Sequence, residues 1–244
     1  MLFLYTDYGA NDLYLGQVHA ALESHAPGLP RVDLLNDAPS FNVRASAHLL
    51  AALAGRFGPG SVFLAVVDPG VGSERAAAVL EADGRFFVGP DNGLLSVAAT
   101  RAEQRRFWHI TWRPEALSDS FHGRDLFAPI AAWIARGAFP TPRLRHVSEL
   151  DHDFGGEELA EVIYIDHYGN AMTGLQGPGL ARTARIVTQH RHLPYARVFS
   201  EVPKGEPFWH ENSIGLAEIA VNSGHAAREL GLAIGQHVVV MTDA

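Results

Sequence analysis

The stretch Leu64–Arg75, with the sequence LAVVDPGVGSER, constrains the fold of this chain more than any other. Phe63–Val67 is an unbroken run of apolar, β-favouring residues, which is typical of a strand buried on both faces of a sheet. Asp68, Pro69 and Gly70 follow directly; proline fixes φ, and glycine permits angles that other residues avoid. The stretch predicts a core strand that ends abruptly at a carboxylate, where open α/β sheets bind ligands. Taken alone, the same residues also fit an ordinary turn.

Other polar residues follow predicted strands in the same way. Leu2–Tyr5 is a short apolar run that leads into Asp7, and Asn11 is placed to cap a helix with Asp12 in its first turn. Gly89–Gly93, with the sequence GPDNG, is another tight turn after a strand-like stretch. If the strands are parallel, these turns lie at the same edge of the sheet as the turn after the core strand. A plain polar turn or a helix cap is the alternative interpretation of each.

A histidine stands at the start of a later predicted helix. His122 precedes Leu126–Ile134, whose apolar residues recur at helical spacing. The positive end of the helix dipole disfavours an imidazolium, so we expect His122 to be neutral and able to accept a proton. Arg75 is close enough in sequence to turn back toward Asp68. A lone histidine at a helix start is more often a solvated polar residue, and only its neighbouring motifs favour a function.

The pattern of elements changes along the chain. Strand–turn–helix units repeat up to about residue 138, which predicts an α/β domain with a mostly parallel sheet flanked by helices. Asp83-Gly84 between two strand-like runs predicts a β-hairpin. Residues 137–142 and 146–156 have the mixed composition of a linker. Beyond them, short strand-like stretches such as Arg197–Phe199 predict a smaller antiparallel, β-barrel-like domain. We expect the α/β domain to span residues 1–150 and the β-rich domain residues 158–244.

The composition excludes several classes of function. A net charge of −8 over 244 residues argues against a nucleic-acid backbone as the main partner and suits a cationic small molecule. The absence of cysteine excludes disulfides and thiolate zinc sites. No apolar run approaches the roughly 20 residues that span a bilayer, and no leader segment is evident. We therefore expect no membrane partner and a cytoplasmic location.

Two motifs in the predicted C-terminal domain combine groups that suit a nucleoside. Asp166–Asn170, with the sequence DHYGN, brings together a carboxylate, the ring of Tyr168 and an amide. A flat heteroaromatic base needs such a stacking face and an edge that both donates and accepts. Asn212-Ser213 and the turn at Asn222–Gly224 offer hydroxyl and backbone donors. Each motif alone also fits an Asx-turn.

The polar motifs follow one another in an order that spans almost the whole chain. They are TDYG at 6–9, VVDPGVG at 66–72, Arg75, GPDNG at 89–93, FHGRDLFAP at 121–129, DHYGN at 166–170 and NSIGLAEIAVN at 212–222. This ordered set resembles the S-adenosylmethionine hydroxide adenosyltransferase family, whose relatives include the fluorinase and chlorinase enzymes. The order is far more specific than any single motif.

The resemblance implies a hydrolase that needs no cofactor and no metal. Water or hydroxide attacks the ribose C5′ of S-adenosyl-L-methionine (SAM), which gives adenosine and L-methionine. By resemblance, Asp68, Arg75 and His122 prepare the water. The sulfonium leaves as a neutral thioether, so the reaction needs a nucleophile held in line in a dry pocket rather than an acid. Either Asp68 or His122 can accept the proton, and the sequence leaves that choice open.

The resemblance also implies substrate contacts in both predicted domains. Asp7 holds the ribose diol, and Asp12 and Asp166 face the methionine ammonium. Tyr168 stacks on adenine, and Asn170 meets the adenine edge. The carboxylates suit a ligand that carries sulfonium and ammonium charges.

Further contacts implied by the resemblance come from the last motif. Ser213 meets the methionine carboxylate, and the backbone near Val221 and Ser223 meets adenine. The family is trimeric, with each site between the N-terminal domain of one subunit and the C-terminal domain of a neighbour, so we expect a homotrimer. Phe208–Glu211 is more polar than the family's pattern before Asn212, which leaves the methionine-carboxylate end least defined.

Three alternatives stay open at this stage. A SAM-dependent halogenase of the same superfamily would use halide in place of water. A metal-dependent phosphoesterase would use carboxylates and histidines such as Asp7, Asp91 and His167 as ligands. A non-catalytic nucleoside or SAM-binding protein would bind without turnover.

Overall fold

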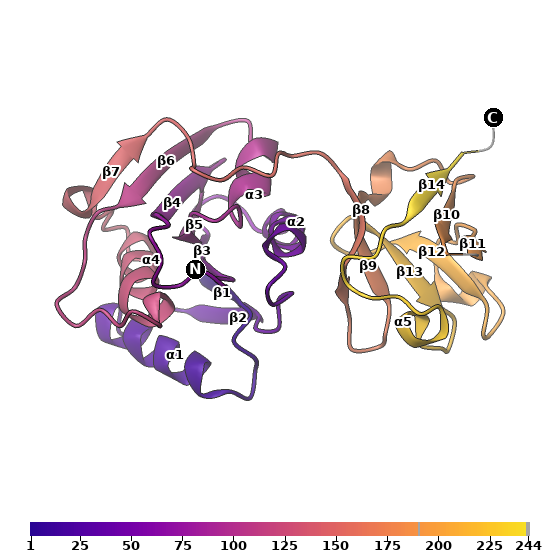
Figure 1. Ribbon diagram of the computed structural model, residues 1–244, viewed down its shortest axis with the longest axis horizontal. Helices are drawn as coiled ribbons and strands as arrows, with labels where there is room; N and C mark the ends of the chain where they lie inside the picture. The colour runs from indigo at the N-terminus through magenta and orange to yellow at the C-terminus, as the bar shows by residue number, and fades with distance from the viewer. Residues whose placement is uncertain (190, 243–244) are drawn as a thin grey trace. The chain divides into compact units, whose positions relative to one another are not determined.

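The apolar run around Leu64 forms strand β3 (Val62–Val66), and every side chain in it is buried. It pairs in parallel with β1 (Leu2–Thr6) on one side and with β5 (Arg85–Pro90) on the other. β3 therefore lies inside a sheet of order β2-β1-β3-β5-β4-β6-β7 (Figure 1). The prediction of a core strand that ends just before Asp68 is confirmed.

The computed structural model describes residues 1–189 and 191–242. The chain divides into two units, Met1–Gly156 and Glu157–Ala244. Each unit has its own buried core and is described by itself. No helix within the described ranges is long and apolar enough to cross a membrane.

Most strands of the first sheet run in one direction. β2 (Arg31–Leu35), β1, β3 and β5 pair in parallel. β4 (Ala77–Ala82) is antiparallel to both β5 and β6 (Arg105–Ile110), so β6 runs in the direction of β5. β7 (Leu144–Val147) pairs antiparallel with β6 at the edge. The predicted mostly parallel sheet is confirmed.

Two predicted connections in this unit, a hairpin turn and a linker, can be compared with the structure. Asp83 and Gly84 form the turn between β4 and β5 with φ of 49° and 76°. Two successive residues with positive φ are typical of a type I′ hairpin turn, so that prediction is confirmed. The interpretation of residues 146–156 as linker is wrong at its start, because β7 includes His146. The two middle residues of β7 are polar and exposed, so the sequence of this edge strand lacks the apolar run that would predict a strand.

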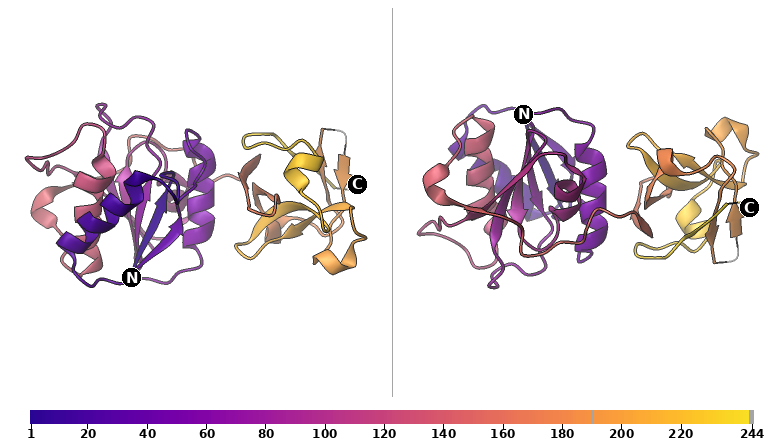
Figure 2. Two further views of the ribbon diagram at one scale, coloured as in Figure 1. Left: turned by 90° about the horizontal axis from the view of Figure 1, so that it is seen from below. Right: turned by 90° about the horizontal axis from the view of Figure 1, so that it is seen from above.

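Helices cover both faces of the first sheet. α1 (Leu13–His25) packs against α4 (Ala128–Ala135), which also contacts β3. α2 (Val43–Ala54) packs against the short α3 (Ser96–Arg101). Figure 2 shows the sheet between α1 and α4 on one side and α2 on the other. The predicted layers of an α/β domain are confirmed.

Helix α1 begins one residue later than the sequence suggests. Asp12, rather than Asn11, is its N-cap, and Asp12 Oδ1 accepts a hydrogen bond from the backbone N–H of Leu13 (2.6 Å). Leu13 is 65% exposed, whereas Leu15 and Val18 begin the buried stripe. The buried face of the helix therefore begins at Leu15. The hydrogen bond of the cap holds the Asp12 carboxylate beside the loop that follows β1.

The second unit consists of two antiparallel sheets, of order β12-β13-β9-β8 and β11-β10-β14. Their strands are Leu159–Ile165 (β8), Ala171–Gln176 (β9), Arg185–Thr188 (β10), Arg191–Leu193 (β11), Pro207–Glu211 (β12), Leu216–Val221 (β13) and Val239–Met241 (β14). Single bridges connect the edges of the two sheets, from Glu161 to His237 and from Tyr195 to Trp209. These bridges close a barrel-like ring, so the predicted antiparallel β-barrel-like domain is confirmed.

Two short elements complete the second unit. Phe199–Glu201 is a 3₁₀ turn, so the prediction of a strand at 197–199 is wrong. The Glu201 carboxylate accepts a hydrogen bond from the backbone N–H of Arg197 (3.0 Å), and such local bonds compete with strand pairing. α5 (Ala226–Glu229) is a single helical turn.

We expect the buried imidazole of His48 on α2 to make stability depend on pH. Burial, together with the Arg101 and Arg44 charges, lowers the pKa of His48 to about 4 from its ordinary 6.5. Between pH 6.5 and pH 4, the unfolded chain therefore binds a proton at His48 that the folded protein does not bind. The free energy of unfolding falls as the pH drops through this range. At about 1.4 kcal/mol per pKa unit, the loss reaches about 3 kcal/mol. His48→Gln keeps an acceptor for Arg101, which lies 3.4 Å from His48 Nδ1.

Urea unfolding of the wild type and of His48→Gln at pH 7 and pH 4.5 measures this effect. The wild type should lose more free energy of unfolding than the variant between the two pH values. An equal loss in both proteins would contradict the account.

Candidate functional site

Asp68 is held by the turn that follows β3. The backbone N–H of Val71 donates to the Asp68 carbonyl (3.3 Å), which closes the turn. Gly72 has φ of 81°, and a Cβ at this position would press against the carbonyl of Asp119. Only glycine fits both conditions. The turn therefore reverses the chain closely enough for Arg75 to reach back to Asp68.

Arg75 and Asp68 form a buried ion pair. Arg75 Nε donates to Asp68 Oδ1 (2.7 Å), and Arg75 Nη2 donates to Asp68 Oδ2. The two side chains are only 7% and 5% exposed. Arg75 Nη1 also donates to the Ala76 carbonyl (3.1 Å), and the guanidinium lies 5.4 Å from the centre of the Phe127 ring. This two-point geometry fixes the orientation of the carboxylate as well as its charge.

His122 completes the group from the other side of the guanidinium. It immediately precedes a π-helical turn, Gly123–Phe127, that leads into α4. Its Nδ1 lies 3.3 Å from Arg75 Nη2. A guanidinium has no lone pair, so the ring nitrogen that faces it accepts, and the other ring nitrogen carries the proton of the neutral imidazole.

The electrostatics of His122 agree with a neutral ring. Burial lowers the pKa of His122, and the Arg75 charge lowers it further. The neutral state matches the sequence-based expectation, although burial and Arg75 account for it here. The prediction that Asp68, Arg75 and His122 lie together is supported by this geometry.

A cavity of about 280 Å³ opens in front of these groups. Carboxylates and aromatic rings form most of its wall, together with His122: they are Asp7, Asp12, Asp68, Tyr8, Tyr14 and Phe121. The three rings contact one another with centres 5.3 to 5.9 Å apart. A cavity with an apolar aromatic wall and several carboxylates suits a cationic organic ligand.

Two residues that follow β1 set the polarity of this cavity. Burial raises the pKa of Asp7, and the nearby Asp68 charge adds to that rise. Burial also raises the pKa of Tyr8, so its hydroxyl stays neutral. A side chain at Gly123 would overlap the Tyr8 hydroxyl, so glycine is needed where the π-helical turn passes this ring. A positive ligand in the cavity would relieve the repulsion between Asp7 and Asp68.

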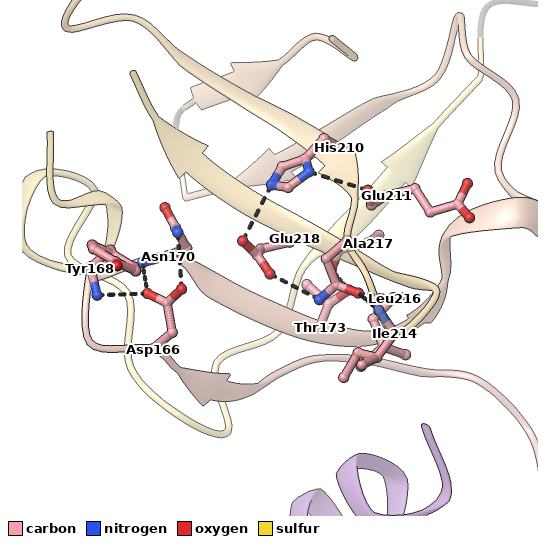
Figure 3. A network of polar contacts seen from close by, with 11 residues as sticks. Asp166, Tyr168, Asn170, Thr173, His210, Glu211, Ile214, Leu216, Ala217 and Glu218 are labelled. Atoms are coloured by element: carbon pink, nitrogen blue, oxygen red, sulfur yellow. Dashed lines mark hydrogen bonds and ion pairs between the residues drawn. The ribbon is translucent and has the colours of Figure 1, made fainter. Parts of the chain in front are cut away.

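The predicted adenine-binding motif of the second unit is a tight turn tied by Asp166. Asp166 Oδ1 accepts from the backbone N–H groups of Tyr168 (3.0 Å) and Asn170 (2.8 Å), and Oδ2 accepts from Asn170 Nδ2 (3.0 Å) (Figure 3). Gly169 has φ of 88°, and a Cβ there would overlap the His225 ring. Tyr168 is 74% exposed at the tip of the turn, as a ring that stacks on a ligand would be. Asp166 thus has a structural task in this turn.

The remaining predicted contacts flank β13 at its two ends. Ser213 lies in the turn before β13, and Val221 is its buried last residue. Ser223 follows with φ of 60°, and its hydroxyl donates to Asn222 Oδ1 (3.3 Å). The turn that includes Ser223 lies against the Asp166 turn, since the position of Gly169 abuts His225.

Asp91 and Asn92 serve the fold rather than the cavity. Asn92 Nδ2 donates to the Val67 carbonyl (2.9 Å) and so braces the end of β3. Asp91 is buried and accepts from His109 Nε2 (3.1 Å) and from the backbone N–H of Asp151 (3.0 Å). Within residues 1–189 and 191–242, Asp91, His109 and Asp151 are the one group whose ligand atoms gather as a metal would need. Asp91 is among the ligands of the phosphoesterase alternative, whereas Asp7 and His167 are not part of this group.

Sequence reasoning missed the aromatic wall of the cavity. Tyr8 directly follows Asp7, and Phe121 directly precedes His122, so their positions beside predicted site residues were the available signal. It also missed His210 and Glu218 on β12 and β13, whose contact depends on strand register.

Comparison with known proteins gives consistent relatives over the whole chain. Residues 2–143 match the N-terminal domain, and residues 160–239 the C-terminal domain, of SAM hydroxide adenosyltransferase. The chain is 37% identical to an (R)-S-adenosyl-L-methionine hydrolase from Salinispora arenicola, covering 96% of this chain and 95% of that protein. It is 36% identical to a protein of the same name from Thermus thermophilus, covering 97% and 98%. The crystal structure of an uncharacterized conserved protein from Thermotoga maritima superposes with a TM-score of 0.89 at 30% identity, covering 99% and 100%.

We expect His122 to titrate below pH 6.5, because burial and Arg75 both disfavour its imidazolium form. NMR of protein with ¹³C-labelled histidine, with the signal assigned by its loss in His122→Gln, measures the midpoint. Arg75→Ala removes the positive neighbour and leaves Asp68 unopposed, so the midpoint should rise. A wild-type midpoint at or above 6.5, or no rise in Arg75→Ala, would contradict the claim that burial and Arg75 disfavour the imidazolium form.

Proposed function

The chain belongs to the SAM hydroxide adenosyltransferase family, and on that basis we propose that it hydrolyses S-adenosyl-L-methionine to adenosine and L-methionine. A water oxygen forms a bond to the ribose C5′, and the C5′–S bond breaks. Its electron pair goes to sulfur, which leaves as the neutral thioether of methionine. The observation that carries the proposal is the contact of Arg75 with both Asp68 and His122 at the wall of a carboxylate-lined cavity.

We assign the base of this reaction to Asp68. His122 uses one ring nitrogen to accept from Arg75, so its other nitrogen carries a proton and can donate to the water oxygen. Asp68 lines the cavity, and each of its oxygens has a second lone pair besides the one that faces Arg75. The water becomes strongly acidic as its bond to carbon forms, so a carboxylate suffices to accept its proton. Arg75 holds the carboxylate in place and supports the developing hydroxide.

The charges of the ligand match the proposed binding groups. The substrate carries a sulfonium and an ammonium, and Asp7 and Asp12 line the cavity as carboxylates. We assign Asp7 to the ribose diol and Asp12 to the ammonium. The substrate brings its own leaving group, so the reaction requires no cofactor.

The second unit supplies the remaining contacts in this proposal. Tyr168 stacks on adenine, and Asn170 and the backbone at Val221 and Ser223 bind its edge. Ser213 binds the carboxylate of the methionine part. Asp166 supports the ammonium in addition to tying its own turn. SAM is a cytoplasmic metabolite, which favours a cytoplasmic location.

We propose a homotrimer in which the C-terminal domain of one subunit completes the cavity of a neighbour. Apolar side chains exposed close to the carboxyl edge of the first sheet support this assembly. Leu13 and Phe41 are 65% and 85% exposed, and Tyr14, which lines the cavity, is 42% exposed. Large apolar side chains left exposed at the start of α1 and in the loop after β2 fit an interface with a neighbouring subunit.

Incubation of the enzyme with SAM in H₂¹⁸O tests the reaction directly. The names of the relatives specify the (R) configuration at sulfur, so each sulfonium epimer is assayed alone. We expect ¹⁸O in the 5′-hydroxyl of adenosine and unlabelled methionine. Chlorinated nucleoside on addition of chloride would indicate a halogenase instead, and tight binding without turnover would indicate a sensor.

Variants in the same assay provide the controls. Asp68→Asn should reduce kcat by roughly 10²- to 10⁴-fold while binding of SAM, measured by calorimetry, changes little. Asp153→Asn, at an exposed carboxylate that bonds only the backbone N–H of Gly155 among the described residues, should leave kcat unchanged. Circular dichroism checks the fold, because Asp68→Asn leaves a buried guanidinium without its counter-ion. Full turnover in Asp68→Asn would rule out Asp68 as the base.

Sedimentation equilibrium tests the assembly. We expect three times the chain mass of 26.4 kDa at micromolar concentration. Phe41→Glu should shift the mass toward the single chain and lower turnover, because it places a charge in the proposed interface. A single-chain mass together with full activity in the wild type would contradict the shared site.

A further inference from the structure

Glu218 is a buried carboxylate in the middle of the C-terminal sheet. It lies on β13, between β12 and β9, with only 6% of its side chain exposed. All other residues of β13 are apolar and buried. Burying a carboxylate costs free energy, and an apolar residue of similar size often gives equal or greater stability. The position therefore calls for a reason other than stability.

Both oxygens of Glu218 are used by groups that precede β13. Its Oε1 lies 3.2 Å from His210 Nε2, across the strand pair, and its Oε2 accepts from Asn212 Nδ2 (2.8 Å) (Figure 3). His210 Nδ1 faces the Glu211 carbonyl oxygen (3.2 Å). Both neighbours of the His210 ring are thus acceptors, so whichever ring nitrogen carries a proton can donate to one of them.

The amide of Asn212 organises the turn before β13. Its Oδ1 accepts from the backbone N–H groups of Ile214 (3.1 Å) and Leu216 (3.0 Å). An amide can rotate by half a turn and exchange its oxygen and nitrogen at little cost unless its partners differ in kind. Glu218 can only accept, so it holds the nitrogen, and the oxygen necessarily faces the turn. Glu218 thereby fixes the backbone on either side of Ser213.

Ser213 lies exposed at the tip of this turn. Within residues 1–189 and 191–242, no hydrogen bond takes up its hydroxyl or its backbone N–H. Two such donors on one residue of a fixed turn suit the two oxygens of a carboxylate.

We propose that Glu218, together with His210, is a positioning residue for substrate recognition. It sets the Asn212 amide so that Ser213 presents its donors to the carboxylate of the methionine part of SAM. This inference rests on the proposed function, and it makes Glu218 act on one end of the substrate only. Adenine binding and the attacking water are outside its reach.

The test compares SAM with decarboxylated SAM, which lacks only that carboxylate. Glu218→Ala should raise KM for SAM about tenfold or more, the cost of a weakened charged hydrogen bond, with kcat within about twofold. The same variant should leave KM for decarboxylated SAM within about twofold of the wild type. Ser213→Ala, a surface change that does not threaten folding, should show the same pattern. A general loosening of the domain would raise both KM values together.

Conservative variants separate positioning from packing. Glu218→Gln should restore most of the affinity, because its Oε1 can accept from Asn212 while its Nε2 donates to a neutral His210 ring. His210→Phe, which keeps the ring beside Phe199 and Phe208, should show an intermediate rise in KM for SAM and stands in if Glu218→Ala does not fold. Glu206→Ala, at an exposed carboxylate of the same unit, should leave KM unchanged for both substrates.

The outcomes distinguish this inference from the proposed function. No turnover of SAM by the wild type would overturn the proposed function. Wild-type turnover, with equal KM changes for both substrates in Glu218→Ala or His210→Phe, would overturn the positioning role alone.

Discussion

The buried ion pair between Asp68 and Arg75 is the interaction on which the rest of the site depends. Two charges withdrawn from water are tolerated only where the geometry satisfies both, and here two parallel hydrogen bonds do so. That geometry requires β3 to end where it does and Gly72 to reverse the chain. The guanidinium also lies over the Phe127 ring. The fold of the first unit thus delivers one oriented carboxylate to one cavity.

In each of the two units, a buried charged side chain orients a neighbouring polar group, and the two cases serve different purposes. Arg75 can only donate, so it determines which nitrogen of His122 carries the proton. Glu218 can only accept, so it determines which way the Asn212 amide points. In each case a buried charge removes the ambiguity of a neighbouring group that could otherwise adopt two states. The first device serves the chemistry, and the second serves recognition of one end of the substrate.

The sequence predicts those elements whose conformation depends on residues close together in the chain. The apolar run of β3 and the Asp83-Gly84 turn follow from residue types and spacing alone. The linker predicted at 146–156 includes the second half of β7, because an exposed edge strand depends on its partner rather than on its own pattern. Asp12 rather than Asn11 caps α1, because the helix begins at Leu13 and the Asp12 carboxylate accepts from the backbone N–H of that residue.

For the site, too, the sequence predicts individual residues but not the contacts between distant ones. Asp68 and Asp7 could be selected from the sequence because they follow strands, and the ordered motifs added Arg75 and His122. The tautomer of His122 could not be selected, since it depends on a contact between residues 47 positions apart. The pairing of His210 with Glu218 depends on the register of β12 and β13, which a one-residue slip would abolish.

The most direct measurement of the central claim is a crystal structure of the protein with adenosine and methionine bound. The 5′-oxygen of adenosine stands where the attacking water was. If Asp68 and His122 prepare the water, this oxygen lies within hydrogen-bond distance, about 2.6–3.2 Å, of both the Asp68 carboxylate and a ring nitrogen of His122. Adenosine bound with its 5′-oxygen remote from both groups would contradict it.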